Sequence, residues 1–221
     1  MKRQLAVSDF LKPLDEAPMQ AYLSNALQVA DIMEWIIGQI GECDIIQSSF
    51  SVSEEYLRRL YFMKAREQVK SITLLLDLKA TNMTVKLWVF ISQLVKNTFL
   101  ADNHSKILLF SAADGRRVSV ITSQNLTRGN RNESTVVTTC PQIYKSLYSS
   151  IQDIIRNNSV PLTEIMDNAM NFTPPPHLLV DFQLVIIFLL WSLFLQHKMS
   201  FLSISRNMPQ STCLSRISRC S

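Results

Sequence analysis

The sequence predicts an α/β protein with a mixed, largely parallel sheet flanked by helices and a hydrophobic C-terminal segment. Three observations support this class. Several stretches repeat apolar residues at steps of three and four, which is typical of amphipathic helices. Short apolar runs lie between them, as expected of buried strands. Helical stretches connect the early strands, which favours parallel pairing. The 221 residues, 47% of them hydrophobic, are enough for one packed domain with appendages.

Helices and strands alternate through the first hundred residues. The first 19 residues lack periodicity and are predicted to form an N-terminal arm. A helix is predicted over residues 19–40, and Gly41 ends it. Ser51 and Glu54 have the spacing of a capping box and begin a helix that reaches about residue 69. The same reasoning gives strands at 44–50 and 72–76 and a helix from Thr81 or Asn82 to about residue 96.

The second half of the domain is predicted to be richer in strands. Asp114-Gly115 favours a tight hairpin, and Pro141 suits the first turn of a helix over 141–157. The strands around them are predicted at 98–101, 105–110, 117–121 and 135–139. These four strands follow one another without a helix between them, and the domain is assigned to residues 20–158.

The tail changes character after a linker at 159–177 that contains three consecutive prolines. Residues 178–195 are apolar apart from three positions and are long enough to span a bilayer as a helix. The remaining Ser- and Arg-rich residues, up to 221, have no periodicity. Residues 178–221 are thus open to three interpretations: a membrane anchor, a helix docked on the domain or a partner, or out-of-frame sequence. With no signal peptide recognised, we expect a cytoplasmic protein, with membrane association through 178–195 left open.

The charge of the chain lies in its tail. Of 22 Lys and Arg residues, four fall after residue 197, which leaves 18 against 18 Asp and Glu. The domain is therefore not a bulk binder of polyanions, and any contact with nucleic acid must be local. Four arginines near one loop offer such a contact and are the predicted substrate-binding residues: Arg116, Arg117, Arg128 and Arg131.

One stretch, residues 103–134, gathers groups that suit phosphate chemistry. His104 and Lys106 are two residues apart, so in an extended strand both side chains point to one face. The returning strand delivers Ser123 and Asn125 with the same spacing, and Glu133 follows. An imidazole can attack phosphorus or donate a proton, while the amine and amide hold the developing charge. Glu133 could hold an imidazole in its productive orientation. No metal-ligand spacing is present, and we expect neither metal nor cofactor.

These residues resemble the signature of the phospholipase D superfamily, H-x-K-x4-D, then G-S-x-N and an acidic residue. The matching segments are H-S-K at 104–106, T-S-Q-N at 122–125 and N-R-N-E at 130–133. Two positions depart from the family pattern: Ser111 replaces the aspartate and Thr122 replaces the glycine.

The resemblance implies a phospholipase D-like domain and metal-independent phosphodiester hydrolysis through a phosphohistidine. In that superfamily two such motifs meet at one site, and this chain has one, so the resemblance implies a homodimer. Nucleic acid, DNA or RNA, is the predicted substrate because of the single motif and the nearby arginines. Two alternatives stay open: a membrane-associated enzyme acting on phospholipids, and a catalytically degenerate binding or scaffold protein in which Ser111 reflects the loss of activity.

Overall fold

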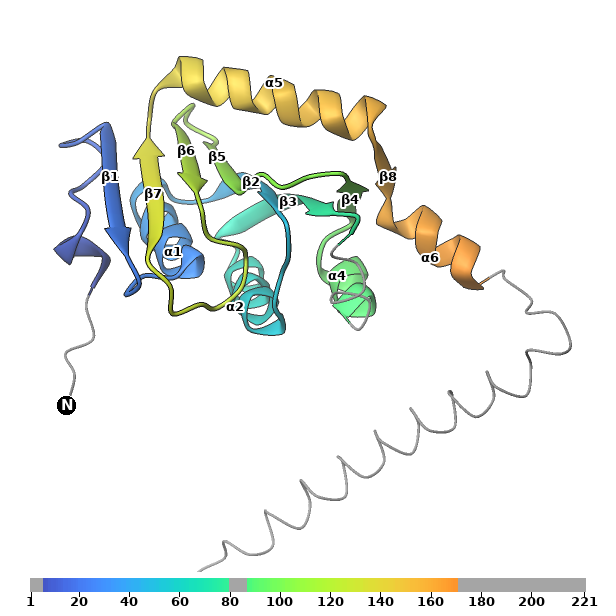
Figure 1. Cartoon of the computed structure of the whole chain (residues 1–221). Coiled ribbons are helices and arrows are strands. Elements are labelled where there is room, and N and C mark those ends of the chain that lie inside the picture. The colour runs from blue at the N-terminus through green and yellow to red at the C-terminus, as the bar shows by residue number, and fades with distance from the viewer. Residues whose placement is uncertain (1–5, 80–86, 171–221) are drawn as a thin grey trace, which may run out of the picture. The chain divides into compact units, whose positions relative to one another are not determined.

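The structure, a computed structural model, describes residues 6–79 and 87–170. Its elements are a three-residue 3-10 turn, η1, then strands and helices that alternate as far as α4, and then four consecutive strands before α5 (Figure 1). Their bounds are η1 Val7–Asp9, β1 Met19–Ser24, α1 Val29–Ile40, β2 Cys43–Ser49, α2 Glu54–Ala65, β3 Val69–Asp77, α4 Trp88–Leu94, β4 Asn97–Ala101, β5 Ile107–Ala112, β6 Arg117–Thr122, β7 Glu133–Thr138, α5 Pro141–Asn157, β8 Ser159–Pro161 and α6 Leu162–Met170.

Eight strands form one sheet in the order β1-β7-β6-β5-β2-β3-β4-β8. Only the β2–β3 and β3–β4 pairs are parallel, and the other five pairs are antiparallel. The prediction of a largely parallel sheet is therefore wrong. Helical crossovers do make the early strands parallel, but β5, β6 and β7 form an antiparallel meander, and β5 joins β2 in the antiparallel sense.

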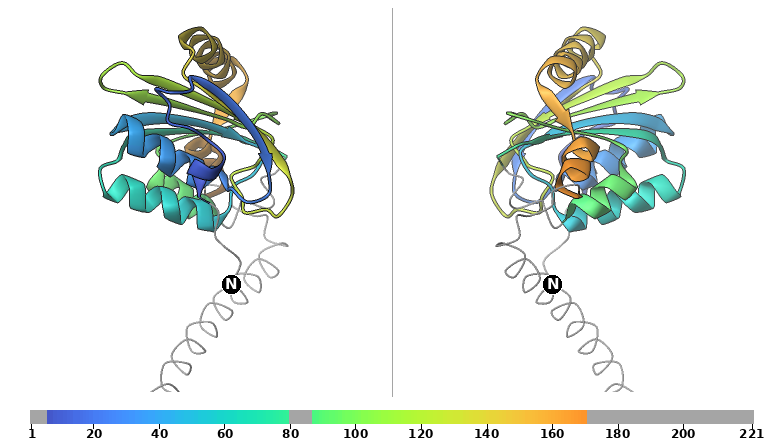
Figure 2. Two further views of the ribbon diagram at one scale, coloured as in Figure 1. Left: turned by 90° about the vertical axis from the view of Figure 1, so that its left-hand side faces the viewer. Right: turned by 90° about the vertical axis from the view of Figure 1, so that its right-hand side faces the viewer.

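Helices cover both faces of the sheet. Helices α1, α2 and α4 lie on one face, and α5 runs across the other, as the side views show (Figure 2). The larger core lies between the first three helices and the sheet; Leu57, Leu60 and Leu74 are completely buried there. A smaller core lies under α5, where Ile151 packs with Leu75 and Leu109.

Local signals explain where several elements begin and end. The Ser53 hydroxyl accepts a hydrogen bond from the Tyr56 backbone N–H (3.3 Å) and caps α2. Pro141 occupies the first turn of α5, as predicted. The turn between β5 and β6 contains Gly115 with φ of 95°, a conformation that glycine adopts without strain.

The N-terminal prediction is wrong in its first part. Residues predicted to begin a helix at Met19 form strand β1 instead, and the helix starts at Val29. Exposure alternates along β1, as it does in a strand with one covered face. Pairing with β7 therefore overrides the helical spacing. The preceding residues are anchored too, because Leu11 and Leu14 are buried in the core.

The C-terminal part of the described chain contains two elements that were predicted as linker. Strand β8 pairs with β4 at the edge of the sheet, and α6 contributes the buried Leu162 to the core. Within residues 6–79 and 87–170, no helix has the length and apolar character needed to cross a bilayer. The apolar segment 178–195 lies outside the described residues.

Candidate active site

A solvent-open groove lies where strands β5 and β6 meet the start of β7. Its volume is about 800 Å³. The hairpin register explains why distant residues converge here: Ile107 pairs with Ile121, so the residues just before β5 lie beside those just after β6. The side chains that line the groove include all five predicted catalytic residues: His104, Lys106, Ser123, Asn125 and Glu133.

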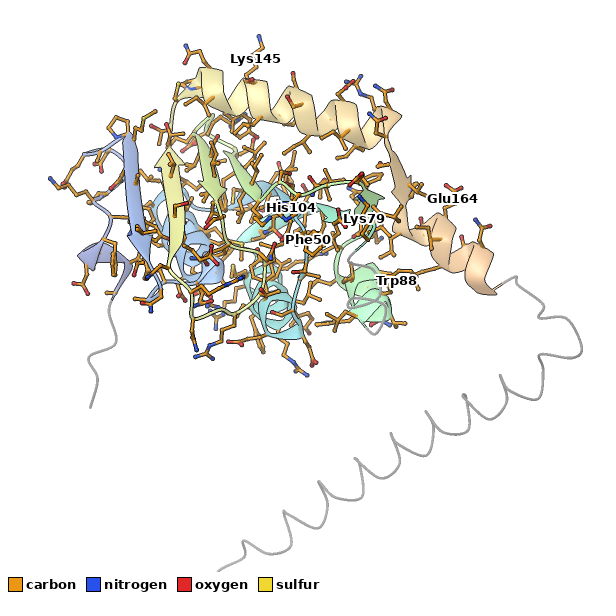
Figure 3. The ribbon with its side chains drawn as sticks, viewed as in Figure 1. Phe50, Lys79, Trp88, His104, Lys145 and Glu164 are labelled. Carbon is orange, nitrogen blue, oxygen red and sulfur yellow. The ribbon has the colours of Figure 1, made fainter. Side chains whose placement is uncertain are left out.

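His104 is exposed in the groove and held from two sides. The Lys106 Nζ atom lies 3.3 Å from the imidazole Nδ1 and donates a 2.8 Å hydrogen bond to the His104 carbonyl oxygen. The ring of Phe50 meets the imidazole edge-on at a centroid distance of 5.2 Å, and both residues are labelled in Figure 3. The imidazole therefore has a packed edge and a cationic neighbour while it stays open to solvent.

Two opposing effects act on the pKa of the Lys106 amine. Partial burial lowers this pKa, and the negative charges of Glu133 and Asp77 raise it, with a net lowering. A lysine in this position loses its proton more readily than an exposed one. Its ammonium group is the nearest cation for a phosphate placed against His104.

Glu133 is engaged within its own part of the groove. Its Oε2 accepts a short hydrogen bond from the Ser123 hydroxyl, and its Oε1 lies 3.7 Å from the Arg131 Nε. The Ser123 Oγ in turn accepts the Ser134 backbone N–H at 3.1 Å. Glu133 thus orients Ser123 and Arg131, and its described hydrogen bonds and ion pairs do not include His104.

Asn125 lines the groove, but its amide oxygen is shielded from solvent. Its side-chain Oδ1 is buried and makes no hydrogen bond among the described residues. A buried amide oxygen without a donor is costly, on the order of 1–3 kcal/mol. The Asn125 Nδ2 is the group that can donate to an anionic oxygen, since an amide oxygen only accepts.

The predicted arginine cluster separates in space. Arg131 lines the groove with 83% of its side chain exposed. Arg128 instead pairs with Glu55 at 3.4 Å, beside the α2 helix. The structure thus brings one arginine of the four to His104.

Arg116 and Arg117 lie at the opposite end of the β5–β6 hairpin. Arg116 pairs with Asp114 and donates to the carbonyl oxygens of Gln39 and Ile40. Arg117 lies against the ring of Tyr144, with its Cζ 5.8 Å from the ring centroid. Both side chains are used in stabilising the fold, and neither reaches the groove.

Ser111 occupies a similarly distant position. It lies near the turn end of β5, paired with Arg117, and a hydrogen bond with Ser111 opposes the rise that burial causes in the pKa of Tyr144. The departure from the family pattern at this position therefore lies at a contact between the sheet and α5, outside the groove lining.

Two residues of the site were missed by the sequence reasoning. Phe50 lines the groove, and Asp77 lies behind it with 2% of its surface exposed. Phe50 directly follows β2, and Asp77 is the last residue of β3. These two strands are parallel, and ligand sites in α/β proteins form at the carboxyl ends of parallel strands. That rule could have found them. Among the described residues, no group of three or more His, Cys, Asp or Glu side chains is placed to hold a metal ion.

The chain has a phospholipase D-like α/β fold, because solved structures with that fold match it. A polyphosphate kinase from Porphyromonas gingivalis aligns with a TM-score of 0.51 and 14% identity, covering 68% of this chain and 30% of the kinase. The likeness at this identity concerns the fold alone. No protein-family model and no curated protein sequence matches the chain.

Two further structures are similar over about the same part of the chain. NucT from Helicobacter pylori has a TM-score of 0.49 and 13% identity, covering 65% of this chain and 98% of NucT. The phosphatidylserine synthase of Haemophilus influenzae has a TM-score of 0.47 and 13% identity, covering 66% of this chain and 41% of the synthase. This chain therefore spans less than half the length of the kinase and of the synthase.

Proposed function

We propose that this protein is a metal-independent phosphodiesterase that cleaves nucleic acid through a phosphohistidine at His104, acting as a homodimer. One observation carries the proposal: the predicted nucleophile, cation, hydroxyl, amide and carboxylate all line a single groove. These groups come from the segments just before β5, just after β6 and at the start of β7. Their convergence meets the requirements of phosphoryl transfer, a nucleophile with cations and donors around the phosphate.

The proposed first step transfers the phosphoryl group to the protein. An imidazole nitrogen of His104 attacks phosphorus, a P–N bond forms, and the P–O bond to the leaving strand breaks. The ammonium of Lys106 and the amide of Asn125 hold the non-bridging oxygens, and a general acid protonates the leaving oxygen. Water then attacks phosphorus, the P–N bond breaks, and the acid, now acting as a base, takes the proton of that water.

A second copy of the chain is proposed to provide the general acid. His104 is the single histidine in the part of the chain that the structure describes, and His177 and His197 lie outside it and outside any H-x-K motif. A two-fold axis near the groove would bring two His104 imidazoles to one phosphate, one as nucleophile and one as acid.

The character of the groove supports nucleic acid as the substrate. It is wide and open, and Arg131 and Lys106 supply positive charge along it. An extended polyanionic strand is bound through such open, cationic grooves. Phe50, at the same surface, is an aromatic ring of the type on which bases stack.

The proposal is tested with the purified full-length protein and labelled single- and double-stranded DNA in EDTA. We expect cleavage that is lost in His104→Ala and retained in His177→Ala, the same substitution outside the motif. Quenching with base and detergent during turnover should trap a phosphorylated protein whose label is stable to base and labile to acid, as phosphohistidine is. Absence of cleavage of any phosphodiester by the wild type would reject the enzyme proposal.

Two other outcomes would redirect the assignment. Hydrolysis of phospholipid vesicles without cleavage of nucleic acid would favour a lipid substrate. Binding of nucleic acid without hydrolysis would favour a scaffold. Such a result would be explained by the contacts that Glu133 makes with Ser123 and Arg131, because they occupy its carboxylate.

A further inference from the structure

The segment that carries His104 alternates between anchored and reactive residues. Asn103 is 4% exposed and Ser105 is half-buried, while the intervening His104 is exposed in the groove. The Asn103 Oδ1 accepts hydrogen bonds from the Ser105 N–H (3.2 Å) and hydroxyl (2.6 Å). The Asn103 Nδ2 also donates to the Ser49 carbonyl oxygen at 3.4 Å. The inward side chains therefore fasten this segment to the end of β2.

Asp77 fastens the same segment to the end of β3. This buried carboxylate accepts the Asn103 backbone N–H through Oδ2 at 2.9 Å and the Lys79 backbone N–H through Oδ1 at 2.7 Å. Hydrogen bonds to a carboxylate are shorter and stronger than those to a neutral oxygen. One side chain thus fixes the backbone directly before His104 against the strand end on which Asp77 lies.

The position is an expensive one for a charged group. Removing a carboxylate from water costs several kcal/mol, which good hydrogen bonds must offset. Simple support of a loop could be given by a neutral side chain. The carboxylate adds an electrostatic effect, since its charge also raises the pKa of Lys106 against the lowering effect of burial.

We infer that Asp77 is a positioning residue of the site: its carboxylate holds the backbone at Asn103 and thereby sets where the His104 imidazole stands in the groove. The inference rests on the proposed function for its consequence in catalysis. A displacement of about 1 Å in a reacting group can cost on the order of 100-fold in rate. Asp77 touches no reacting atom and acts through the segment that it holds.

The kinetic test replaces Asp77 by asparagine in the full-length chain. Asparagine keeps the shape, but its NH2 group must face one of the two backbone N–H groups, so one bond is lost. We expect kcat on labelled DNA to fall about 10- to 100-fold, as for other residues that orient a reacting group. KM should change by less than about twofold, because the groups that contact the substrate remain.

Asp102→Asn is the matched control on the same segment. Its carboxylate is 81% exposed and pairs with Lys79 at the surface, 3.0 Å away. The same chemical change there should leave kcat and KM within about twofold of the wild type, as expected of an exposed ion pair. A loss in Asp102→Asn as large as in Asp77→Asn would overturn the inference.

A second measurement needs no turnover. Amide hydrogen exchange by NMR should show the Asn103 and Lys79 N–H groups protected in the wild type. In Asp77→Asn the Asn103 amide should exchange at least about tenfold faster, the equivalent of about 1.4 kcal/mol, and the His104 ring signals should shift. Protected amides in a protein that cleaves nothing would reject the proposed function alone. An active protein with an unprotected Asn103 amide would reject the positioning role alone.

Asn103→Ala covers the case in which Asp77→Asn does not fold. This variant keeps the Asp77 carboxylate and its backbone partner but removes the bonds to Ser105 and Ser49. We expect a reduced kcat with KM again within about twofold. Wild-type kcat in a folded Asn103→Ala protein would show that the anchoring of this segment does not matter, and the inference would fall.

Discussion

Charge at the groove depends on a few individual side chains, and Lys106 is the most sensitive of them. Its amine lies 3.3 Å from the His104 Nδ1, and the charges of Glu133 and Asp77 raise its pKa against the larger lowering by burial. The cationic form holds a phosphate, so activity should persist below the pKa of this amine and decline as the pH rises through it. Because burial lowers that pKa, the decline should begin at lower pH than an ordinary lysine would give.

Glu133→Gln tests this dependence directly. The substitution removes a negative charge that raises the Lys106 pKa. The pKa should therefore fall further, and the alkaline limb of the kcat/KM profile should move to lower pH. Glu55→Gln, at a carboxylate paired with Arg128 outside the groove, should leave that limb in place. A limb that stays fixed or moves upward in Glu133→Gln would contradict this account.

Arg131 and Arg128 make a matched pair for testing nucleic-acid contact. Arg131 lines the groove, whereas Arg128 is paired with Glu55. Arg131→Ala should weaken DNA binding for all sequences alike and reduce the slope of log Kd against log salt by about 1. Arg128→Ala should change the slope much less. Binding titrations at several salt concentrations measure this slope. Equal effects of the two variants would argue against the groove as the site where nucleic acid binds.

That the candidate residues converge on one groove could be predicted from the sequence, because they fall within thirty residues joined by one hairpin. Strand alternation and the Asp114-Gly115 turn bring His104, Lys106, Ser123 and Asn125 together, and the family resemblance assigns their roles. Arg116 was predicted to bind substrate beside His104, but the length of the hairpin strands separates the two residues. Arg116 is near these residues in sequence, but strands of six residues place the turn about 20 Å from the groove. Asp77 requires knowledge of which strand ends meet, and this depends on the sheet order.

At the scale of elements, α5 shows how a strong sequence pattern and its packing agree. Its bounds, Pro141–Asn157, are those predicted from the sequence, and its buried face lies on the sheet. Helix α5 leaves part of that sheet face exposed near β1, where Leu23 is 71% exposed. The stability of the sheet on this side therefore depends on few contacts.

Ile151→Ala tests the contribution of that helix. Ile151 is 2% exposed and packs on Leu75, Ala101 and Leu109. Truncation should lower the free energy of unfolding by about 2–5 kcal/mol, measured by urea denaturation. Leu23→Ala, at an exposed aliphatic position, should cost less than about 0.5 kcal/mol. Similar costs at the two positions would mean that α5 is not packed as described.

The elements that the sequence did not predict were missed for the same reason: their formation depends on pairing between distant strands. Strand β1 carries apolar residues whose spacing also fits a helix, and only its pairing with β7 decides between the two. Strand β8 has three residues, too few for an alternating pattern. The antiparallel majority of the sheet likewise results from long-range pairing, which local periodicity does not encode.

At the scale of the whole molecule, the proposed chemistry requires two chains. We expect sedimentation equilibrium to give twice the mass of the 221-residue chain. Mixing wild-type protein with an excess of His104→Ala under conditions of subunit exchange should lower the wild-type activity, because mixed dimers lack one of the two imidazoles. A fully active monomer, or activity unaffected by the excess, would contradict the two-chain site.

The alternation of residues 103–106 makes the count of residues in this segment matter as much as their identity. An extended chain turns successive side chains to opposite sides. Pairing with β2 and β6 fixes the register of β5. Inserting or deleting one residue between Lys106 and Ile107 would therefore point the imidazole toward the interior and leave the Asn103 amide facing the solvent, although every residue type is kept. A change of two residues would restore the parity. Relatives of this protein should therefore vary the length of this segment only in even steps.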